Sequence, residues 1–263
     1  MNEPIYNEIG INYSKYRKAD NRIVEKIIGL LALPNYRVIA EVGAGTGNYS
    51  SAIAEKGYSI KAIEPSSIMI EQRKEHPDIE WIKGQAEDIP LEDKSTDAVL
   101  GVLSIHHFSD LNKAFKEMNR VSIDGKILLF TYDPRQIDRW WLGDYFPFLW
   151  NDSFKYFLPL EKITDMLYSV TGNQVSIHTF ELPYDLTDYF AAAGWRKPEI
   201  YLDPVVRSCM SAFASADQTI VKNGLETLRE DLNNGEWDRK YGWLRSKSKM
   251  DLGYRFVLSS YQK

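Results

Sequence analysis

The chain has 263 residues, 44% of them apolar and 26% charged, which is ordinary for a globular protein able to bury a sizeable core. Its net charge of −5 has the wrong sign for nucleic-acid binding, which depends mainly on lysine and arginine contacts to phosphates. No apolar run reaches the roughly 18 residues of a membrane-spanning helix, and residues 1–10 lack the basic and apolar segments of a secretory leader. We therefore expect a cytoplasmic protein with no membrane span and no nucleic-acid partner.

The cysteine and histidine content of the chain argues against a disulfide and against a metal site. Cys209 is the only cysteine, so neither an intramolecular disulfide nor a thiolate metal cluster can form. The four histidines occur without HxxxH or HExxH spacing. We predict no metal site.

The first half of the chain alternates helical patterns with short apolar runs. Residues 23–33 carry apolar side chains at helical spacing until Pro34 stops the pattern, and residues 37–43 form a short apolar run that enters a glycine-rich turn. The same alternation continues, with helices predicted at 48–56, 66–76 and 111–122, and strands at 59–65, within 79–91, within 95–108 and at 125–134. This order predicts an α/β fold with a mostly parallel sheet, helices on both faces, and ligands beyond the carboxyl ends of the strands.

The second half of the chain is richer in aromatic residues. Six of the seven tryptophans lie beyond Pro134, and residues 135–160 are crowded with aromatic side chains. A helix is predicted at 161–170, a strand at 174–182, mostly helical chain at about 184–250, and a closing strand at 251–263. We interpret this half as helical insertions on the same sheet rather than as an independent domain.

The glycine-rich turn "EVGAGTG" contains a carboxylate, which is unusual for a phosphate-binding loop. A P-loop needs a lysine after its last glycine, and a dinucleotide turn needs its third glycine at Asn48, one residue after Gly47. Glu41 is the only charged side chain near the turn, and it would repel a pyrophosphate but attract an amino group. Glu64, at the end of the next predicted strand, stands where an acidic residue holds both ribose hydroxyls of a nucleoside. Together the two acids predict a site for a nucleoside with a cationic amino-acid tail, and S-adenosylmethionine (SAM) is such a molecule.

Four motifs then occur in order: "EVGAGTGNYS", "AIEPSSIMIEQ", "GQAEDIPLEDKSTDAV" and "VLSIHHF". They resemble the successive motifs of class I SAM-dependent methyltransferases, and most closely the small-molecule group similar to ubiquinone and menaquinone biosynthesis methyltransferases. The resemblance covers about residues 12–134. It implies a Rossmann-like, seven-stranded sheet whose last strand is antiparallel and inserted beside the fifth. We predict one methyltransferase domain over residues 1–263, with a SAM-binding core at 12–134. The aromatic-rich residues 135–160 and 184–250, which neither bind SAM nor complete the sheet, are predicted to form a substrate cap.

The resemblance assigns cofactor contacts by position. Glu41 and the turn residues Gly43, Ala44, Gly45 and Gly47 would hold the methionine end of SAM, and Glu64 would hold the ribose. Gln85 stands where many relatives have an aspartate, so the adenine amino group would be read by the backbone or by Glu87. The remaining contacts implied by position are Pro65, Ser66 and Met69 beside the adenine, Ala86 at its edge, Leu103, and Tyr13 and Arg17 in an N-terminal segment that covers the cofactor. Two of these assignments have an alternative. Met69 also fits an ordinary core position, and the N-terminal segment also fits an ordinary amphipathic helix.

His106 and His107 follow the fourth predicted strand, where the crevice opens, and they are the candidate catalytic residues. Histidine is the usual proton acceptor near neutral pH, and the alternative is a residue that only shapes the loop. Little catalysis is needed beyond in-line SN2 geometry and a dry pocket, because a sulfonium methyl is strongly electrophilic. The candidate substrate-binding residues are Tyr16, Trp140, Trp141 and Tyr145, with core packing and a dimer surface as the alternative roles of the aromatic run.

The predicted function is methyl transfer from SAM to a small organic acceptor, with S-adenosylhomocysteine (SAH) as the product. A SAM-binding regulatory module without transferase activity and a nicotinamide-dependent oxidoreductase are the alternatives. We expect a monomer or a homodimer.

Overall fold

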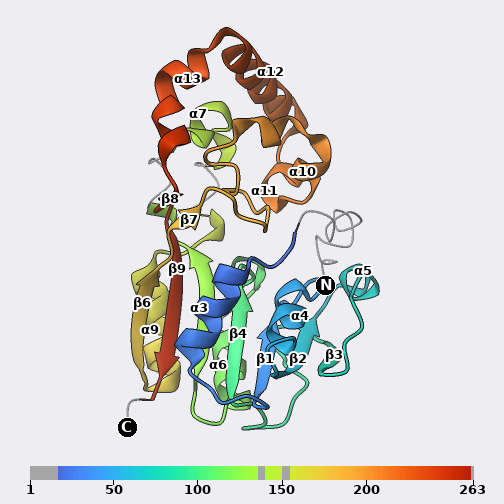
Figure 1. Cartoon of the computed structure of the whole chain (residues 1–263). Helices are drawn as coiled ribbons and strands as arrows, with labels where there is room; N and C mark the ends of the chain where they lie inside the picture. The colour runs from blue at the N-terminus through green and yellow to red at the C-terminus, as the bar shows by residue number, and fades with distance from the viewer. Residues whose placement is uncertain (1–16, 136–139, 150–154, 262–263) are drawn as a thin grey trace.

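The computed structural model describes residues 17–135, 140–149 and 155–261 (Figure 1). Within these ranges the main sheet has seven strands in the order β3-β2-β1-β4-β5-β9-β6. Only β9 runs antiparallel to its neighbours, and it lies between β5 and β6. The strands are β1 (Val38–Val42), β2 (Ser59–Glu64), β3 (Ile79–Lys83), β4 (Ala98–Val102), β5 (Ile127–Tyr132), β6 (Gln174–Thr179) and β9 (Tyr254–Ser260). The predicted fold class is therefore confirmed, including the antiparallel last strand inserted beside the fifth.

Helices cover both faces of this sheet because the strands are apolar on both sides. Alternate residues of β1 face opposite layers: Ile39 packs in the core with α3 (Asn21–Leu31) and α4 (Asn48–Ala54). Ala40 faces the layer formed by α6 (Leu111–Val121) and α9 (Leu160–Thr171), on the far side of the sheet in Figure 1.

Local signals set most helix boundaries. The Asp20 side chain caps α3 by accepting a hydrogen bond from the Arg22 backbone N–H. The helix predicted at 66–76 is shorter in the structure, where α5 spans only Ser67–Glu71. Pro77 accounts for part of this difference, since it disfavours helical backbone at the residue before it.

A helical lobe, defined here as residues 140–149 and 184–248, sits above the carboxyl ends of the strands (Figure 1). Its larger part enters through β7 (Leu182–Pro183) and leaves through β8 (Lys249–Met250), which pair with each other as an antiparallel ribbon. The lobe contains α7 (Leu142–Tyr145), η4 (Pro198–Leu202), α10 (Pro204–Ser208), α11 (Ser211–Ala214), α12 (Gln218–Asn234), α13 (Glu236–Tyr241) and η5 (Gly242–Ser246).

The lobe has its own aromatic centre, built around Trp141. The indole N–H of Trp141 donates a hydrogen bond to the Trp195 carbonyl at 2.8 Å, and its ring meets the rings of Tyr201 and Trp237 edge-on. These side chains belong to the same hydrophobic cluster as the α3 face of the sheet. Lobe and sheet are thus packed together through continuous apolar contact.

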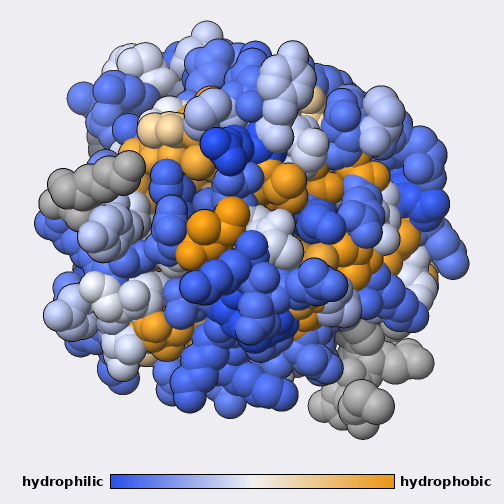
Figure 2. Space-filling model, turned by 90° about the horizontal axis from the view of Figure 1, so that it is seen from below, coloured by the Kyte–Doolittle hydropathy of each residue, from blue (hydrophilic) through white to orange (hydrophobic). Residues whose placement is uncertain are grey.

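The side of the molecule opposite the lobe is largely hydrophilic, with hydrophobic residues interspersed in small groups (Figure 2). Among the described helices, none combines the length and the apolar character needed to cross a membrane.

Candidate active site

The glycine-rich turn joins β1 to α4 at the carboxyl edge of the sheet. Gly43 and Gly47 have φ values of +74° each, in the left-handed region that favours glycine. A Cβ atom at Gly43 would lie 2.6 Å from Cβ of Ser104, and one at Gly47 would lie 2.6 Å from the Trp81 ring. Glycine is therefore required at both positions for conformation and for space.

The Glu64 side chain connects this turn to the end of β2 through hydrogen bonds. One carboxylate oxygen accepts a hydrogen bond from the Gly45 N–H at 2.9 Å, and the other accepts from the Ser66 N–H at 2.8 Å. Burial raises the pKa of Glu64, and the two backbone hydrogen bonds oppose this shift. Because an ionised carboxylate has about four acceptor positions, Glu64 keeps capacity for further donors.

Glu41 is buried beneath the same turn, near the end of β1. The Ser50 hydroxyl, from α4, donates a hydrogen bond to its carboxylate. Burial raises the pKa of Glu41 to about 7, and the negative charge of Glu64 adds to this shift. The two predicted acids are thus neighbours on adjacent strands, and a cation placed near them would favour the ionised form of Glu41.

The residues predicted to lie beside the adenine differ in their exposure to solvent. Ser66 caps α5 through the Met69 N–H, and both residues are buried beside Pro65 at the end of β2. The segment 85–88 forms a tight turn in which Gln85 is exposed and Ala86 is buried.

Glu87 has a structural contact that its position in the sequence did not indicate. One of its carboxylate oxygens accepts hydrogen bonds from the Ser109 N–H and hydroxyl and from the Asp110 N–H. This oxygen anchors the loop that leads into α6, and a contact between Glu87 and the adenine amino group stays a prediction.

The two histidines lie together on a short 3₁₀ turn, η2 (Ile105–His107), directly after β4. Their ring centroids are 3.9 Å apart, and the His106 ring stacks on Phe157 at 4.4 Å. Burial, followed by the nearby His107, lowers the pKa of His106 well below its usual value. The His107 ring is exposed at the edge of the cavity, where desolvation by the surrounding walls, followed by the positive charge of Arg17, lowers its pKa to about 4. Both imidazoles are consequently neutral near pH 7.

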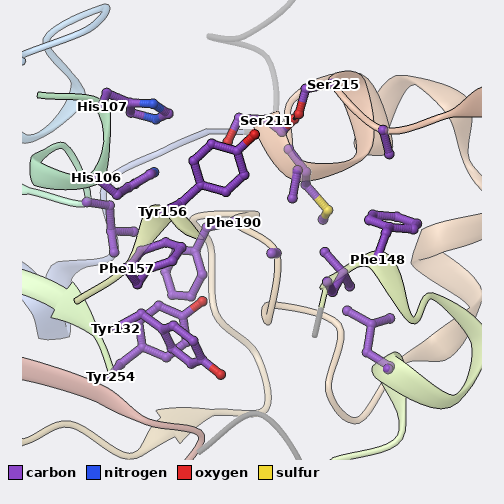
Figure 3. Close-up of a pocket in the computed structure, with 18 of the residues that line it drawn as sticks. His106, His107, Tyr132, Phe148, Tyr156, Phe157, Phe190, Ser211, Ser215 and Tyr254 are labelled. Atoms are coloured by element: carbon purple, nitrogen blue, oxygen red, sulfur yellow. The ribbon is translucent and has the colours of Figure 1, made fainter. Parts of the chain in front are cut away.

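A cavity of about 210 Å³ opens beside these histidines, between the carboxyl ends of the strands and the helical lobe (Figure 3). Its walls are mainly apolar and aromatic, as is typical of small-molecule sites. The lining residues from the sheet side and the N-terminal segment are Arg17, Leu103, His106, His107, Tyr132, Tyr156, Phe157 and Tyr254, and those from the lobe are Trp140, Leu142, Gly143, Phe148, Leu149, Phe190, Ala191, Met210, Ser211, Ala212, Ser215 and Ala216.

Arg17 reaches this cavity while paired to a buried acid. Its guanidinium forms an ion pair with Asp188, which is 1% exposed, and the Tyr49 hydroxyl donates to the same carboxylate at 2.9 Å. Asp188 thereby joins the N-terminal segment, the helix after the glycine turn and the lobe. No local pattern in the sequence marks Asp188 or Tyr49, because each meets its partner only in the folded chain.

The structure also corrects two of the predicted substrate contacts. Trp140 lines the cavity, but Trp141 and Tyr145 do not. Trp141 is 1% exposed in the aromatic centre of the lobe, and the Tyr145 hydroxyl donates to Asp231 on α12 at 2.7 Å. Tyr13 and Tyr16 lie outside the described residues. Sequence reasoning missed Tyr132 and Tyr254, which face each other only because β5 and β9 pair in that register.

The chain is similar to known methyltransferases in sequence and in structure. A family model described as a methyltransferase domain matches residues 40–130. A crystal structure of a proposed methyltransferase from an antibiotic biosynthesis pathway of Anabaena variabilis is 51% identical, with a TM-score of 0.91, and the match covers 93% of this chain and 99% of that protein.

Curated relatives are matched over shorter segments. The demethylmenaquinone methyltransferase of Renibacterium salmoninarum is 35% identical over 105 residues, which cover 40% of this chain and 43% of the relative. An uncharacterized methyltransferase of Mycobacterium tuberculosis is 33% identical over 109 residues, which cover 41% of this chain and 44% of the relative. The matched segments thus span less than half the length of these curated relatives.

Proposed function

Because the chain belongs to the SAM-dependent methyltransferase family, we propose that it transfers the methyl group of SAM to a small organic molecule and releases SAH. The observation that carries this proposal is the position of the cavity, which opens beside His106 and His107 at the same sheet edge as the glycine turn held by Glu64. We further propose that the helical lobe is the substrate cap of a single methyltransferase domain. A cytoplasmic location and a monomeric or homodimeric state stay predictions from the sequence.

The residues present fit SAM. Gly43 and Gly47 let the turn adopt left-handed backbone angles and pack against Ser104 and Trp81, which fixes the loop after β1 at the carboxyl edge of the sheet. In the proposed complex, Glu64 accepts the ribose hydroxyls, Glu41 and residues 43–47 hold the methionine end, and Pro65, Ser66 and Met69 flank the adenine. SAM supplies the electrophilic methyl group, and the chain supplies in-line orientation and an apolar cavity that excludes water.

The first test removes the proposed ribose contact. Glu64→Gln should weaken SAM binding about tenfold or more, because each charge-assisted hydrogen bond contributes about 1.5–3 kcal/mol. Isothermal titration calorimetry with SAM and SAH measures the effect, and circular dichroism confirms folding. Glu80→Gln is the matched control, since Glu80 lies on β3 and pairs with Lys61 away from the turn. Unchanged SAM affinity in folded Glu64→Gln protein would contradict the proposed site.

A second prediction concerns proton release. With a pKa raised to about 7, Glu41 is partly protonated at neutral pH in the free protein. The ammonium group of bound SAM should favour the carboxylate, so binding should release a fraction of a proton from this residue at pH 7. Calorimetry in two buffers of different ionisation enthalpy measures the protons released. The release should disappear in Glu41→Gln, and equal release by both proteins would place the cationic tail elsewhere.

A further inference from the structure

The described residues that line the cavity beside the histidines offer no net charge to a ligand. Among the described residues that line it, Arg17 is the only one with a permanently charged side chain. The buried carboxylate of Asp188 compensates that charge, and Asp188 itself is not part of the lining. No lining carboxylate is therefore present, in the part of the chain that the structure describes, to receive a cationic ligand.

The titratable lining groups are also neutral near pH 7. The pKa values of His106 and His107 are lowered by burial, and for His107 also by Arg17. Burial raises the pKa of Tyr254, with the nearby Arg17 and Asp188 acting in opposite directions. These groups can exchange hydrogen bonds with a ligand but cannot neutralise its charge.

The lining is mostly apolar, with polar groups at a few places. His106, His107 and Tyr156 lie on one side of the cavity, and Figure 3 shows ring nitrogens of both histidines turned toward the space. The lobe wall is formed mainly by apolar side chains such as Leu142, Phe148 and Met210, and Ser211 and Ser215 add two hydroxyls to it. A ligand that fits this arrangement is largely apolar and carries a polar group near the histidines.

We infer that the methyl acceptor is an uncharged, apolar molecule with a hydroxyl group, and that methylation falls on the hydroxyl oxygen. This inference rests on the proposed methyl transfer. Among the described lining residues, an ammonium group would find no counter-ion, and it would lie beside the sulfonium of SAM, which repels it. An aliphatic amine with a pKa near 10.4 could enter only in its neutral form, about one part in 10³ at pH 7. A carboxylate would meet only Arg17, whose charge Asp188 already compensates.

SAM, the acceptor hydroxyl and an imidazole of the site account for every bond and proton in the proposed methyl transfer. A lone pair of the hydroxyl oxygen forms the bond to the methyl carbon, the carbon–sulfur bond breaks, and its electron pair remains on sulfur as the neutral thioether of SAH. The hydroxyl proton passes to a neutral imidazole, for which His107 is placed, and then to solvent. No oxidant, reductant or metal is needed.

The binding test uses three probes of one shape: 2-naphthylmethanol, 2-naphthylmethylamine and 2-naphthoate. Calorimetry first measures SAH binding, and the probes are then titrated into the SAH complex at pH 7. We expect the alcohol to bind most tightly, the carboxylate less tightly, and the ammonium about 10²-fold more weakly than the alcohol, because the aryl group lowers the pKa of this amine to about 9. An ammonium that binds as tightly as the alcohol, or an alcohol that does not bind, overturns the inference. Failure of SAH itself to bind would instead contradict the proposed function.

A charge introduced into the wall provides an independent check. Ser215 lines the cavity at the end of α11 and is exposed there, so Ser215→Asp adds a carboxylate at an accessible position. This variant should improve binding of the ammonium probe about tenfold relative to the alcohol. Ser246→Asp, at an exposed position on η5 outside the lining, is the matched control and should not change the ratio. Equal ratios in both variants would show that the probes bind elsewhere.

The methylated atom is identified with the wild-type protein and SAM carrying a ¹³C-methyl group. Metabolite extracts are incubated with both, and NMR of the labelled product distinguishes methyl on oxygen, nitrogen or carbon. An O-methyl product supports the inference. An N-methyl or C-methyl product overturns it while leaving the methyltransferase activity established.

Discussion

His107→Ala is expected to lower turnover about 10²–10⁴-fold while SAM affinity stays close to that of the wild type. The ring lies on the wall of the cavity, at the end of β4, and it is neutral and able to accept a proton. Removing it leaves the glycine turn and Glu64 untouched, so the loss should appear in kcat rather than in SAM binding. Steady-state kinetics with the identified acceptor, together with calorimetry for SAM, separates the two effects.

The pH profile provides a signature that a purely structural histidine would not give. A base must be deprotonated to act, so activity should fall as the pH drops through the pKa of His107. Because burial and the charge of Arg17 lower that pKa to about 4, turnover at saturating SAM should be nearly constant between about pH 6 and 8. An acidic limb near pH 6.5 would show that the catalytic group is an unperturbed histidine or another residue.

The neighbouring histidine supplies a second comparison. His106→Phe keeps an aromatic ring for the stack on Phe157 but removes both nitrogens. If His107 is the proton acceptor, this variant should retain far more activity than His107→Ala. His178→Ala is the matched control, since His178 lies on β6 outside the cavity lining. A loss of less than about threefold in His107→Ala would assign this residue to loop structure alone.

The part of the fold that could be predicted depends on short-range signals. The apolar run at β1, the glycines after it and Glu64 at the end of β2 are all set by local patterns, so their meeting at one sheet edge could be inferred. The antiparallel β9 followed from the resemblance rather than from the pattern itself, which is compatible with either direction. Its register with β5 then decides that Tyr132 faces Tyr254, and no sequence pattern specified that pairing.

The part that could not be predicted depends on long-range partners. Glu87 fits a ligand contact by position, and the sequence did not indicate that one of its carboxylate oxygens would also accept hydrogen bonds from Ser109 and Asp110. Asp188 becomes an ion-pair partner only through Arg17, 171 residues away. Adjacent tryptophans look equivalent in the sequence, yet Trp140 lines the cavity and Trp141 fills the lobe, because neighbouring side chains at the start of α7 point in different directions.

This difference between the two tryptophans leads to the second large expected effect. Trp141→Ala should destabilise the protein by about 3–5 kcal/mol, because the side chain is 1% exposed and its removal leaves a cavity among Tyr145, Tyr201 and Trp237. The Trp195 carbonyl also loses its 2.8 Å hydrogen-bond donor. Urea-induced unfolding monitored by circular dichroism measures the change in the free energy of unfolding.

Trp140→Ala should behave in the opposite way. Trp140 is only partly buried, and its ring forms part of the cavity wall, so truncation should cost less stability than at Trp141 but should weaken binding of 2-naphthylmethanol to the SAH complex. Trp243→Ala, at a position that is 55% exposed on η5, is the control and should change neither quantity appreciably. If Trp140→Ala destabilises the protein as much as Trp141→Ala and leaves probe affinity unchanged, both tryptophans belong to the core of the lobe. The cavity would then have to bind its ligand without this wall, and the assignment of the helical lobe as a substrate cap would fail with it.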